Sequence, residues 1–137
     1  MVLTSDPCPC HSGSPFGACC RPLLSNKEDA KTPEALMRSR YCAFHFRNIE
    51  HLRQTTDPQT IAQMDWDANE KWAQSASFLK LEVLSSSEDG TKGQVEFKAH
   101  FTLGSDPKIH IHHEISRFRK QAGHWFYREG KTTPAAP

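Results

Sequence analysis

The sequence predicts an α+β fold, with helices in its first half and an antiparallel sheet in its second. Between positions 32 and 72 apolar residues recur at helical spacing, whereas from Ser77 onward they fall on alternate positions. Periods of about 3.6 and about 2 residues are typical of amphipathic helices and half-buried strands. Helices grouped apart from a run of antiparallel strands define the α+β class. A cysteine-rich stretch precedes both parts and needs its own explanation.

This N-terminal stretch contains four of the chain's five cysteines, Cys8, Cys10, Cys19 and Cys20. Neighbouring Cα atoms lie about 3.8 Å apart, less than the roughly 4.4–6.8 Å that a disulfide prefers, so a bond between Cys19 and Cys20 would be strained. Crossed disulfides and free thiols remain alternatives. Four thiolates suit a closed tetrahedral zinc site, and glycines and a proline between the pairs suit a tight turn. We therefore predict a structural Zn²⁺ ion at these cysteines.

The order Cys-Pro-Cys-His-Ser-Gly, completed by a Cys-Cys pair, resembles the SEC-C motif, a zinc module named after the C-terminus of the SecA translocation ATPase. The motif usually has glycine where this chain has His11, a potential competing ligand. The resemblance implies metal binding by the four cysteines. The SecA version contacts the SecB chaperone and is linked to the ribosome. By analogy, the resemblance implies a protein partner among protein-export or ribosome-associated factors.

Composition indicates one domain with a small appendage in 137 residues. The 17 Lys and Arg are balanced by 16 Asp and Glu, which gives no electrostatic indication of nucleic acid or an anionic membrane as a partner. No apolar run approaches the roughly 20 residues of a membrane span. The N-terminus lacks the basic and apolar regions of a signal peptide. We therefore expect a cytoplasmic protein, in which reduced thiols favour metal over disulfides.

The longest predicted helix follows a polar linker and begins at Thr32. Thr32 is a suitable N-cap, and Pro33 is favoured at the first helical position. Met37, Tyr41 and Phe44 then recur at helical spacing, which predicts an amphipathic helix of about 12–14 residues. Shorter helical segments are predicted around 49–52, 57–64 and 66–72.

Four strands are predicted from the alternating second half, at about 79–83, 95–103, 109–119 and 125–127. Turn sequences at 89–90, 104–107 and 122–123 separate them, so we expect an antiparallel meander. Between 95 and 103 the alternation is the longest in the chain. The face toward the helices is predicted to carry Phe97, Phe101, Ile109 and Ile111.

Three segments of this body resemble the uncharacterised YchJ-like family. Residues 35–44 read A-L-M-R-S-R-Y-C-A-F, and H-E-x-S-R-F and G-x-W-x-Y follow in the last two predicted strands. The family joins a SEC-C motif to an NTF2-like domain, a cone of helices on a curved sheet. The resemblance implies a SEC-C module at 1–22, a linker at 23–31, an NTF2-like α+β domain at 32–130 and a flexible tail at 131–137. Cys42 replaces a common serine, so we do not count it as a ligand.

A curved sheet capped by a helix often leaves a concave pocket. His113 and Arg117 share the strand parity of the isoleucines at 109, 111 and 115, and so are predicted to face it. His100, His110 and His112 have the polar parity, which is interpreted as an exposed strand face rather than a second metal site. Structural pairing is the favoured interpretation for the arginines and histidines, and core or rim positions for Trp125 and Tyr127, with ligand contact as the alternative; no catalytic residue is predicted. The possible pocket residues are Arg38, Tyr41, His113, Arg117, Trp125 and Tyr127.

Two functions of different classes are compatible with the sequence. The first is a non-enzymatic protein–protein interaction or adaptor protein that uses the zinc module as its docking tip. The alternative is a small-molecule-binding protein or enzyme that uses the NTF2-like pocket, which rests on fold analogy alone. We favour the adaptor, and expect the body to fold independently of the cysteines. The sequence predicts no oligomeric state.

Overall fold

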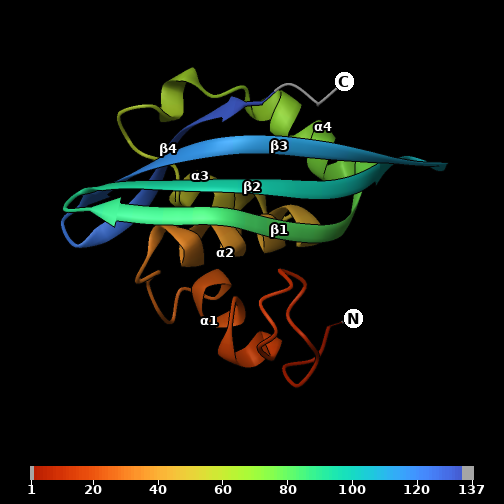
Figure 1. The fold of residues 1–137 in the computed structure, drawn as a ribbon, viewed down its shortest axis with the longest axis horizontal. Coiled ribbons are helices and arrows are strands. Elements are labelled where there is room, and N and C mark those ends of the chain that lie inside the picture. The colour runs from red at the N-terminus through yellow and green to blue at the C-terminus, as the bar shows by residue number, and fades with distance from the viewer. Residues whose placement is uncertain (1, 134–137) are drawn as a thin grey trace.

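The computed structural model describes residues 2–133 and confirms the α+β fold (Figure 1). Helices precede a four-stranded antiparallel meander with strand order β1-β2-β3-β4. None of the helices in the described part of the chain is long and apolar enough to cross a membrane. The helical elements are η1 (Phe16–Ala18), α1 (Arg21–Leu24), α2 (Pro33–Phe46), α3 (Ile49–Gln54), η2 (Ile61–Gln63) and α4 (Trp66–Ser75). The strands are β1 (Ala76–Asp89), β2 (Lys92–Leu103), β3 (Asp106–Gln121) and β4 (His124–Thr132).

Helix α2 begins and ends for identifiable local reasons. The Thr32 side chain accepts a hydrogen bond from Ala35 N at 3.1 Å, and Pro33 occupies the first turn, as predicted. At the other end, Arg47 adopts a left-handed conformation with φ 58°. Helices α2 and α3 lie behind the sheet in Figure 1, and within residues 2–133 no helix covers the opposite sheet face.

The shorter helices follow the sequence prediction less closely. Helices α3 and α4 are capped by the side chains of Asn48 and Asp65, which accept from His51 N and Ala68 N. The helix predicted to begin at Asp57 is reduced to the single turn η2. The N-cap of η2 is Thr60, while the Asp57 carboxylate accepts from Gln59 N at 2.9 Å and is buried against two arginines.

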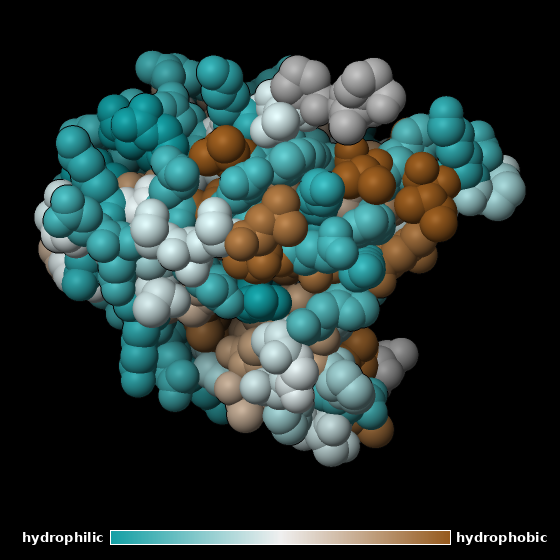
Figure 2. All heavy atoms as spheres, viewed as in Figure 1, coloured by the Kyte–Doolittle hydropathy of each residue, from teal (hydrophilic) through white to brown (hydrophobic). Residues whose placement is uncertain are grey.

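The inward face of β3 differs from the prediction. Phe97 and Phe101 of β2 are buried as expected, but Ile109 and Ile111 are 58% and 54% exposed. Antiparallel partners share a sheet face, and Phe97 is paired with Glu114 rather than with an isoleucine. The even positions of β3 therefore face the helices. Figure 2, from the same side as Figure 1, shows apolar side chains among polar ones on the uncovered face.

The cysteine-rich segment shares its core with the body. Cys8, Cys10, Cys20 and Phe16 belong to the same buried cluster as residues of α2 and β2. The Phe16 ring lies 5.4 Å from that of Phe46, at the end of α2. The predicted linker at 23–31 starts inside α1 and continues as turns and bends. Strand β4 extends into the predicted tail as far as Thr132, and the tail's last residues, 134–137, lie outside the described residues.

Candidate metal centre and ligand cavity

Four cysteines form one compact group. All five cysteines of the chain are free, and the Sγ atoms of Cys8, Cys10, Cys19 and Cys20 lie within 4.8 Å of one another. A tetrahedral ion with metal–sulfur distances of about 2.3 Å requires sulfur separations of about 3.8 Å. Cys10 and Cys19 are 3.6 Å apart and Cys19 and Cys20 are 3.9 Å apart, measured between Sγ atoms. The donor set therefore fits a metal ion.

Local backbone bonds hold the two cysteine pairs together. Cys8 N donates to Ser14 O at 2.9 Å, and an isolated antiparallel bridge joins Pro7 to Pro15. The tight turn between the pairs places His11 at φ 62°, a conformation that normally favours glycine. The His11 ring does not join the cysteines, because its Nε2 lies 3.0 Å from Leu79 O of β1. His11 thus links the segment to the sheet and does not add a ligand to the cysteine group.

Helix α2 contacts the cysteine group through Arg38. Arg38 Nη1 donates to Cys10 O at 2.8 Å and lies 3.9 Å from Cys10 Sγ. Four thiolates around a divalent ion carry net negative charge, which a nearby guanidinium offsets. Cys42 is fully buried, with Sγ 3.7 Å from Cys8 Sγ, but it lies outside the group of four mutually close thiols.

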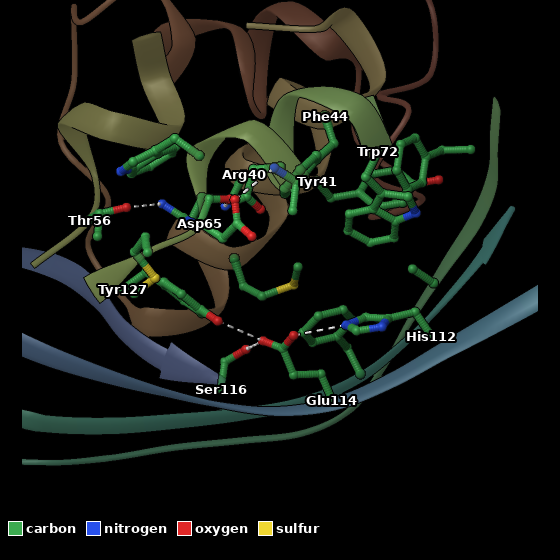
Figure 3. A pocket seen from close by; sticks show the side chains of 18 of the residues that line it. Arg40, Tyr41, Phe44, Thr56, Asp65, Trp72, His112, Glu114, Ser116 and Tyr127 are labelled. Atoms are coloured by element: carbon green, nitrogen blue, oxygen red, sulfur yellow. Dashed lines mark hydrogen bonds and ion pairs between the residues drawn. The ribbon is translucent and has the colours of Figure 1, made fainter. Parts of the chain in front are cut away.

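A second feature is a cavity of about 400 Å³ between the inner sheet face and helices α2 and α4. Most of its wall is aromatic or aliphatic. Three charged side chains, Arg40, Asp65 and Glu114, also line it. Figure 3 shows Arg40 and Tyr41 entering from α2, opposite His112, Glu114 and Ser116 of β3. The apolar lining residues include Tyr41, Phe44, Trp66, Trp72, Phe78, Phe97, Phe118 and Tyr127.

Glu114 is the centre of a hydrogen-bond network on the sheet side of the cavity. Its Oε2 accepts from Ser116 Oγ and from the Tyr127 hydroxyl, the latter at 3.1 Å. Its Oε1 lies 2.8 Å from His112 Nε2, which orients that ring against Trp72. Burial alone would raise the pKa of Glu114, but these hydrogen bonds hold it below its usual value. Glu114 is therefore an ionised, firmly positioned carboxylate.

The Glu114 carboxylate occupies space that a side chain at Gly130 would need. Gly130 is paired with Ser116 across β3 and β4. A Cβ atom at Gly130 would overlap both the Glu114 carboxylate and the Tyr127 hydroxyl. Close approach, rather than an unusual φ angle, therefore requires glycine at this position.

Arg40 forms the opposite, cationic part of the cavity. Its Nη1 donates to Leu52 O, Thr55 Oγ1 and Thr56 Oγ1, which are neutral acceptors at the end of α3. Its guanidinium carbon lies 4.2 Å from the centre of the Tyr127 ring. Burial lowers the pKa of Arg40 to about 10, so it remains charged at neutral pH.

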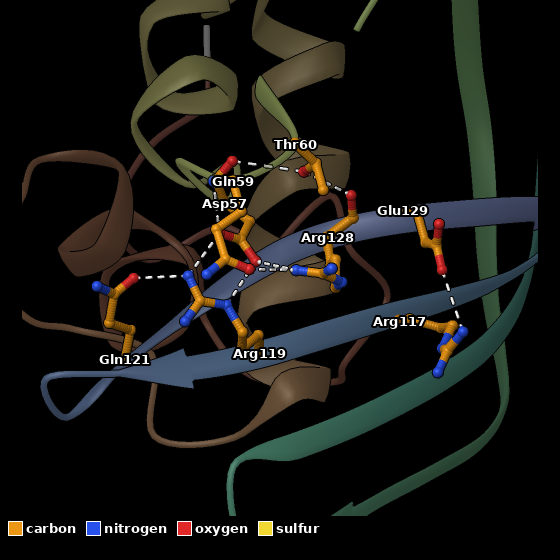
Figure 4. A network of polar contacts seen from close by, with 8 residues as sticks. All are labelled: Asp57, Gln59, Thr60, Arg117, Arg119, Gln121, Arg128 and Glu129. Carbon is orange, nitrogen blue, oxygen red and sulfur yellow. Dashed lines mark hydrogen bonds and ion pairs between the residues drawn. The ribbon is translucent and has the colours of Figure 1, made fainter. Parts of the chain in front are cut away.

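A buried ion-pair cluster fixes the segment that carries these acceptors (Figure 4). Asp57 Oδ1 accepts from Arg119 Nη2 at 2.7 Å, and Oδ2 accepts from Arg119 Nε at 2.7 Å and Arg128 Nη1 at 3.1 Å. These bonds hold the pKa of Asp57 well below its usual range. In addition, Asp57 N donates to Tyr127 O at 2.8 Å, and Tyr127 N donates to Thr55 O at 2.8 Å. The cluster therefore ties the end of α3 to β4.

The predicted pocket residues are divided between several places. Arg38 faces the cysteines, and His113 pairs with Glu96 at 2.7 Å on the outer sheet face. Arg117 forms an exposed ion pair with Glu129. Trp125 is buried beside a smaller cavity of about 170 Å³. The cavity of about 400 Å³ contains only two of the six candidates, Tyr41 and Tyr127.

Sequence reasoning assigned the wrong parity to β3 and so missed the side of the strand that lines the cavity. His113 and Arg117 point outward because the β2–β3 register places His112 and Glu114 inward. His100 lies on the outer face beside Glu82, as expected, but His110 and His112 are paired with the inward-facing Phe101 and Ala99, so the exposed-face interpretation is wrong for these two. Arg40, which lines the cavity, was not among the predicted pocket residues. The signal that could have found this face is hairpin pairing, which joins odd positions of β2 to even positions of β3.

Comparisons with known proteins agree with this architecture. The family model described as the YchJ middle NTF2-like domain matches residues 32–130, and the SEC-C motif model matches residues 5–22. A solution structure of a SEC-C motif containing protein from Rhodopseudomonas palustris has a TM-score of 0.84 and 40% identity, covering 98% of this chain and 100% of that chain. A crystal structure of a SEC-C motif containing protein from Psychrobacter arcticus has a TM-score of 0.79 and 28% identity, covering 100% of this chain and 88% of that one.

Curated relatives of similar length bear the same family name. A UPF0225 protein of Geobacter sulfurreducens is 37% identical over 126 residues, covering 90% of this chain and 77% of the relative. A UPF0225 protein of Deinococcus radiodurans is 38% identical over 122 residues, covering 88% and 85% respectively. These matches confirm both resemblances found in the sequence. The chain therefore belongs to the YchJ-like UPF0225 family and joins a SEC-C motif to an NTF2-like domain.

Proposed function

We propose that this is a small-molecule-binding protein whose working site is the sheet–helix cavity. The observation that carries the proposal is the cavity of about 400 Å³, in which an apolar wall surrounds inward-facing charged side chains. Ligand sites are typically concave and mainly apolar, with a few polar groups that fix orientation. Glu114 and Arg40 are held by multiple hydrogen bonds, so their positions are set before a ligand arrives.

The cavity is tested with a neutral fluorescent dye and a pair of matched variants. N-phenyl-naphthylamine brightens when it leaves water for an apolar site. Ala68 lines the cavity and is exposed, whereas Ala62 is exposed and outside the cavity lining. We expect saturable brightening with the unmodified protein and Ala62→Phe, and a large loss of binding with Ala68→Phe. Equal binding by both variants, or no binding by the unmodified protein, would contradict the proposal.

We further propose that the four cysteines hold a structural zinc ion. Four thiolates leave no open coordination position, which is typical of structural rather than catalytic zinc. Thiolate donors also favour zinc over hard cations such as magnesium. Elemental analysis of protein purified without added metal should give about one zinc per chain. Another metal, or native protein with crossed disulfides, would contradict this assignment.

The adaptor role is a second candidate, favoured by the uncovered sheet face rather than by the cysteines. Leu79, Leu84, Ile109 and Ile111 are each about half exposed there. A protein partner would bury them, whereas Cys8, Cys10 and Cys20 are already buried. The test is a pull-down with unmodified protein, Ile111→Lys and a Cys10→Ser, Cys19→Ser variant. A partner identified in this way is then purified and mixed with each variant. Its binding should be lost with Ile111→Lys, and retained binding would contradict use of this sheet face.

A further inference from the structure

Arg40 is a buried cation whose hydrogen bonds use only part of its donor capacity. The residue is 9% exposed, and the hydrogen bonds that it donates to described residues all come from Nη1. A guanidinium carries five N–H donors in a planar fork. The donors on Nε and Nη2 therefore have no protein acceptor in the described part of the chain, although Arg40 lines the cavity.

The charge of Arg40 is also unpaired. The ion pairs formed among residues 2–133 do not include it. Glu114 is the carboxylate that acts on it electrostatically, but Glu114 is bound to Tyr127, whose ring lies under the guanidinium. A buried charge without a partner is costly, and buried charges are usually paired. An anionic ligand group at the free edge of Arg40 would supply the missing partner.

Contacts with neighbouring segments also fix the orientation of Arg40, so that its Nε–Nη2 edge can meet a ligand. Its Nη1 bonds to Leu52 O, Thr55 Oγ1 and Thr56 Oγ1 fix the guanidinium plane. The Asp57 cluster holds the same segment against β4. The fork is therefore pre-organised, and a ligand that meets it loses little additional side-chain entropy.

We propose that the cavity binds an organic monocarboxylate with an aromatic or similarly apolar body, with its carboxylate on the Nε–Nη2 edge of Arg40. This inference rests on the proposed small-molecule function and names its ligand class. A planar carboxylate matches the guanidinium fork in a bidentate arrangement. Trp72, Phe78 and Phe97 supply the apolar surface for the body.

The remaining charges select a monoanion over a dianion such as a phosphate ester. Glu114 is buried and ionised, and it accepts from the Tyr127 hydroxyl, whereas Arg40 lies over the face of the Tyr127 ring. Asp65 is exposed, and its Oδ1 already accepts from Ala68 N. One buried cation balances one ligand charge, whereas a second negative charge would face these carboxylates without a counter-ion.

The inference is tested with two probes of the same shape, naphthalene carboxylate and naphthalene carboxamide. Binding to the intact protein is measured by titration calorimetry and by NMR of the Arg40 side-chain Nε–H. We expect the carboxylate to bind about tenfold more tightly or better, and to shift the Arg40 signal more than the amide does. Arg40→Met should remove this preference, because it weakens carboxylate binding by a larger factor than amide binding. Arg117→Met, on the outer face, should retain the preference.

The outcomes separate the ligand class from the function itself. If both probes bind equally, or if the preference survives Arg40→Met, the carboxylate inference is overturned and the binding function stands. If neither probe binds the unmodified protein, both are overturned. A purely structural role of Arg40 would weaken both probes together in Arg40→Met. Should that variant not fold, the probe comparison and the Arg40 signal in the unmodified protein still decide.

Discussion

The cysteine group and the cavity are built in opposite ways. The four thiols come from a short segment between positions 8 and 20, and local turns bring them together. The cavity takes Arg40 from α2, Asp65 from the cap of α4 and Glu114 from β3, so it exists only when the whole body is folded. A site made by local chain order is visible in sequence, whereas a site made by strand register is not.

The two regions nevertheless meet at α2. One side of the helix carries Arg38 and Cys42 toward the cysteines, and the other carries Arg40 and Tyr41 toward the body and cavity. Cys8, Cys10 and Cys20 share the buried cluster of the body at this contact, and independent folding of the body stays a prediction. The predictions below separate what each region contributes.

Metal removal is expected to have the largest effect. Metal binding supplies about 10–16 kcal/mol of folding free energy in small zinc peptides. Chelation should abolish hydrogen-exchange protection in residues 7–22 and reduce it in α2, which contacts that segment. Strand β2 should keep its protection, since it lies within the sheet between β1 and β3. Loss of protection at 93–103 would show instead that the whole body depends on the metal.

The inner and outer sheet faces give the next largest contrast. Phe101 is 9% exposed in the core, and Phe101→Ala should lower the free energy of unfolding by about 3–5 kcal/mol. Ile109→Ala, on the exposed face, should change it by less than about 0.5 kcal/mol. Denaturant unfolding measures both. Comparable losses would mean that a partner or second copy covers the outer face in solution.

The two sheet faces also show what the sequence could and could not predict. Capping at Thr32, the turns and the four strands were all readable, because they depend on neighbouring residues. The inward face of β3 was not, because its apolar positions, Ile109 and Ile111, point to solvent while polar residues line the cavity. Burial follows alternation only where both sheet faces obey the usual apolar-inside pattern. A ligand cavity breaks that pattern.

Breaking the Asp57 cluster should have an intermediate effect. The Asp57 side chain is fully buried, while Arg119 and Arg128 retain 23% and 37% side-chain exposure. Asp57→Asn should destabilise the protein by about 2–3 kcal/mol. This is less than the cost of breaking a fully buried ion pair, because the two arginines can still be hydrated. The exposed Arg117–Glu129 pair provides the control, and Glu129→Gln should have almost no effect. Equal effects of the two substitutions in denaturant unfolding would contradict the distinction.

The same cluster predicts a pH dependence. The folded pKa of Asp57 lies below that of an unfolded aspartate, about 3.9, because Arg119 donates to the ionised form. Its stabilisation is therefore complete above that value and is lost as the pH falls through the folded pKa. The stability difference between unmodified protein and Asp57→Asn should stay constant from pH 7 to about 5 and shrink below about 4. A difference that grows on acidification would contradict the ion-pair explanation.

Cys42 gives the smallest expected effect and the sharpest distinction within the cysteine region. The Cys42 Sγ lies 3.7 Å from Cys8 Sγ, about as far as Cys10 Sγ lies from Cys19 Sγ, yet it is outside the mutually close group. Four thiolates already complete a tetrahedral site, so a fifth is not required. Cys42→Ala should therefore retain the metal content of the unmodified protein and cost only about 1 kcal/mol, from loss of a small buried side chain. Cys20→Ala removes an equally buried thiol and should lose the metal. If elemental analysis found that Cys42→Ala also loses metal, the fifth cysteine would belong to the site, and α2 would contribute to the metal centre directly.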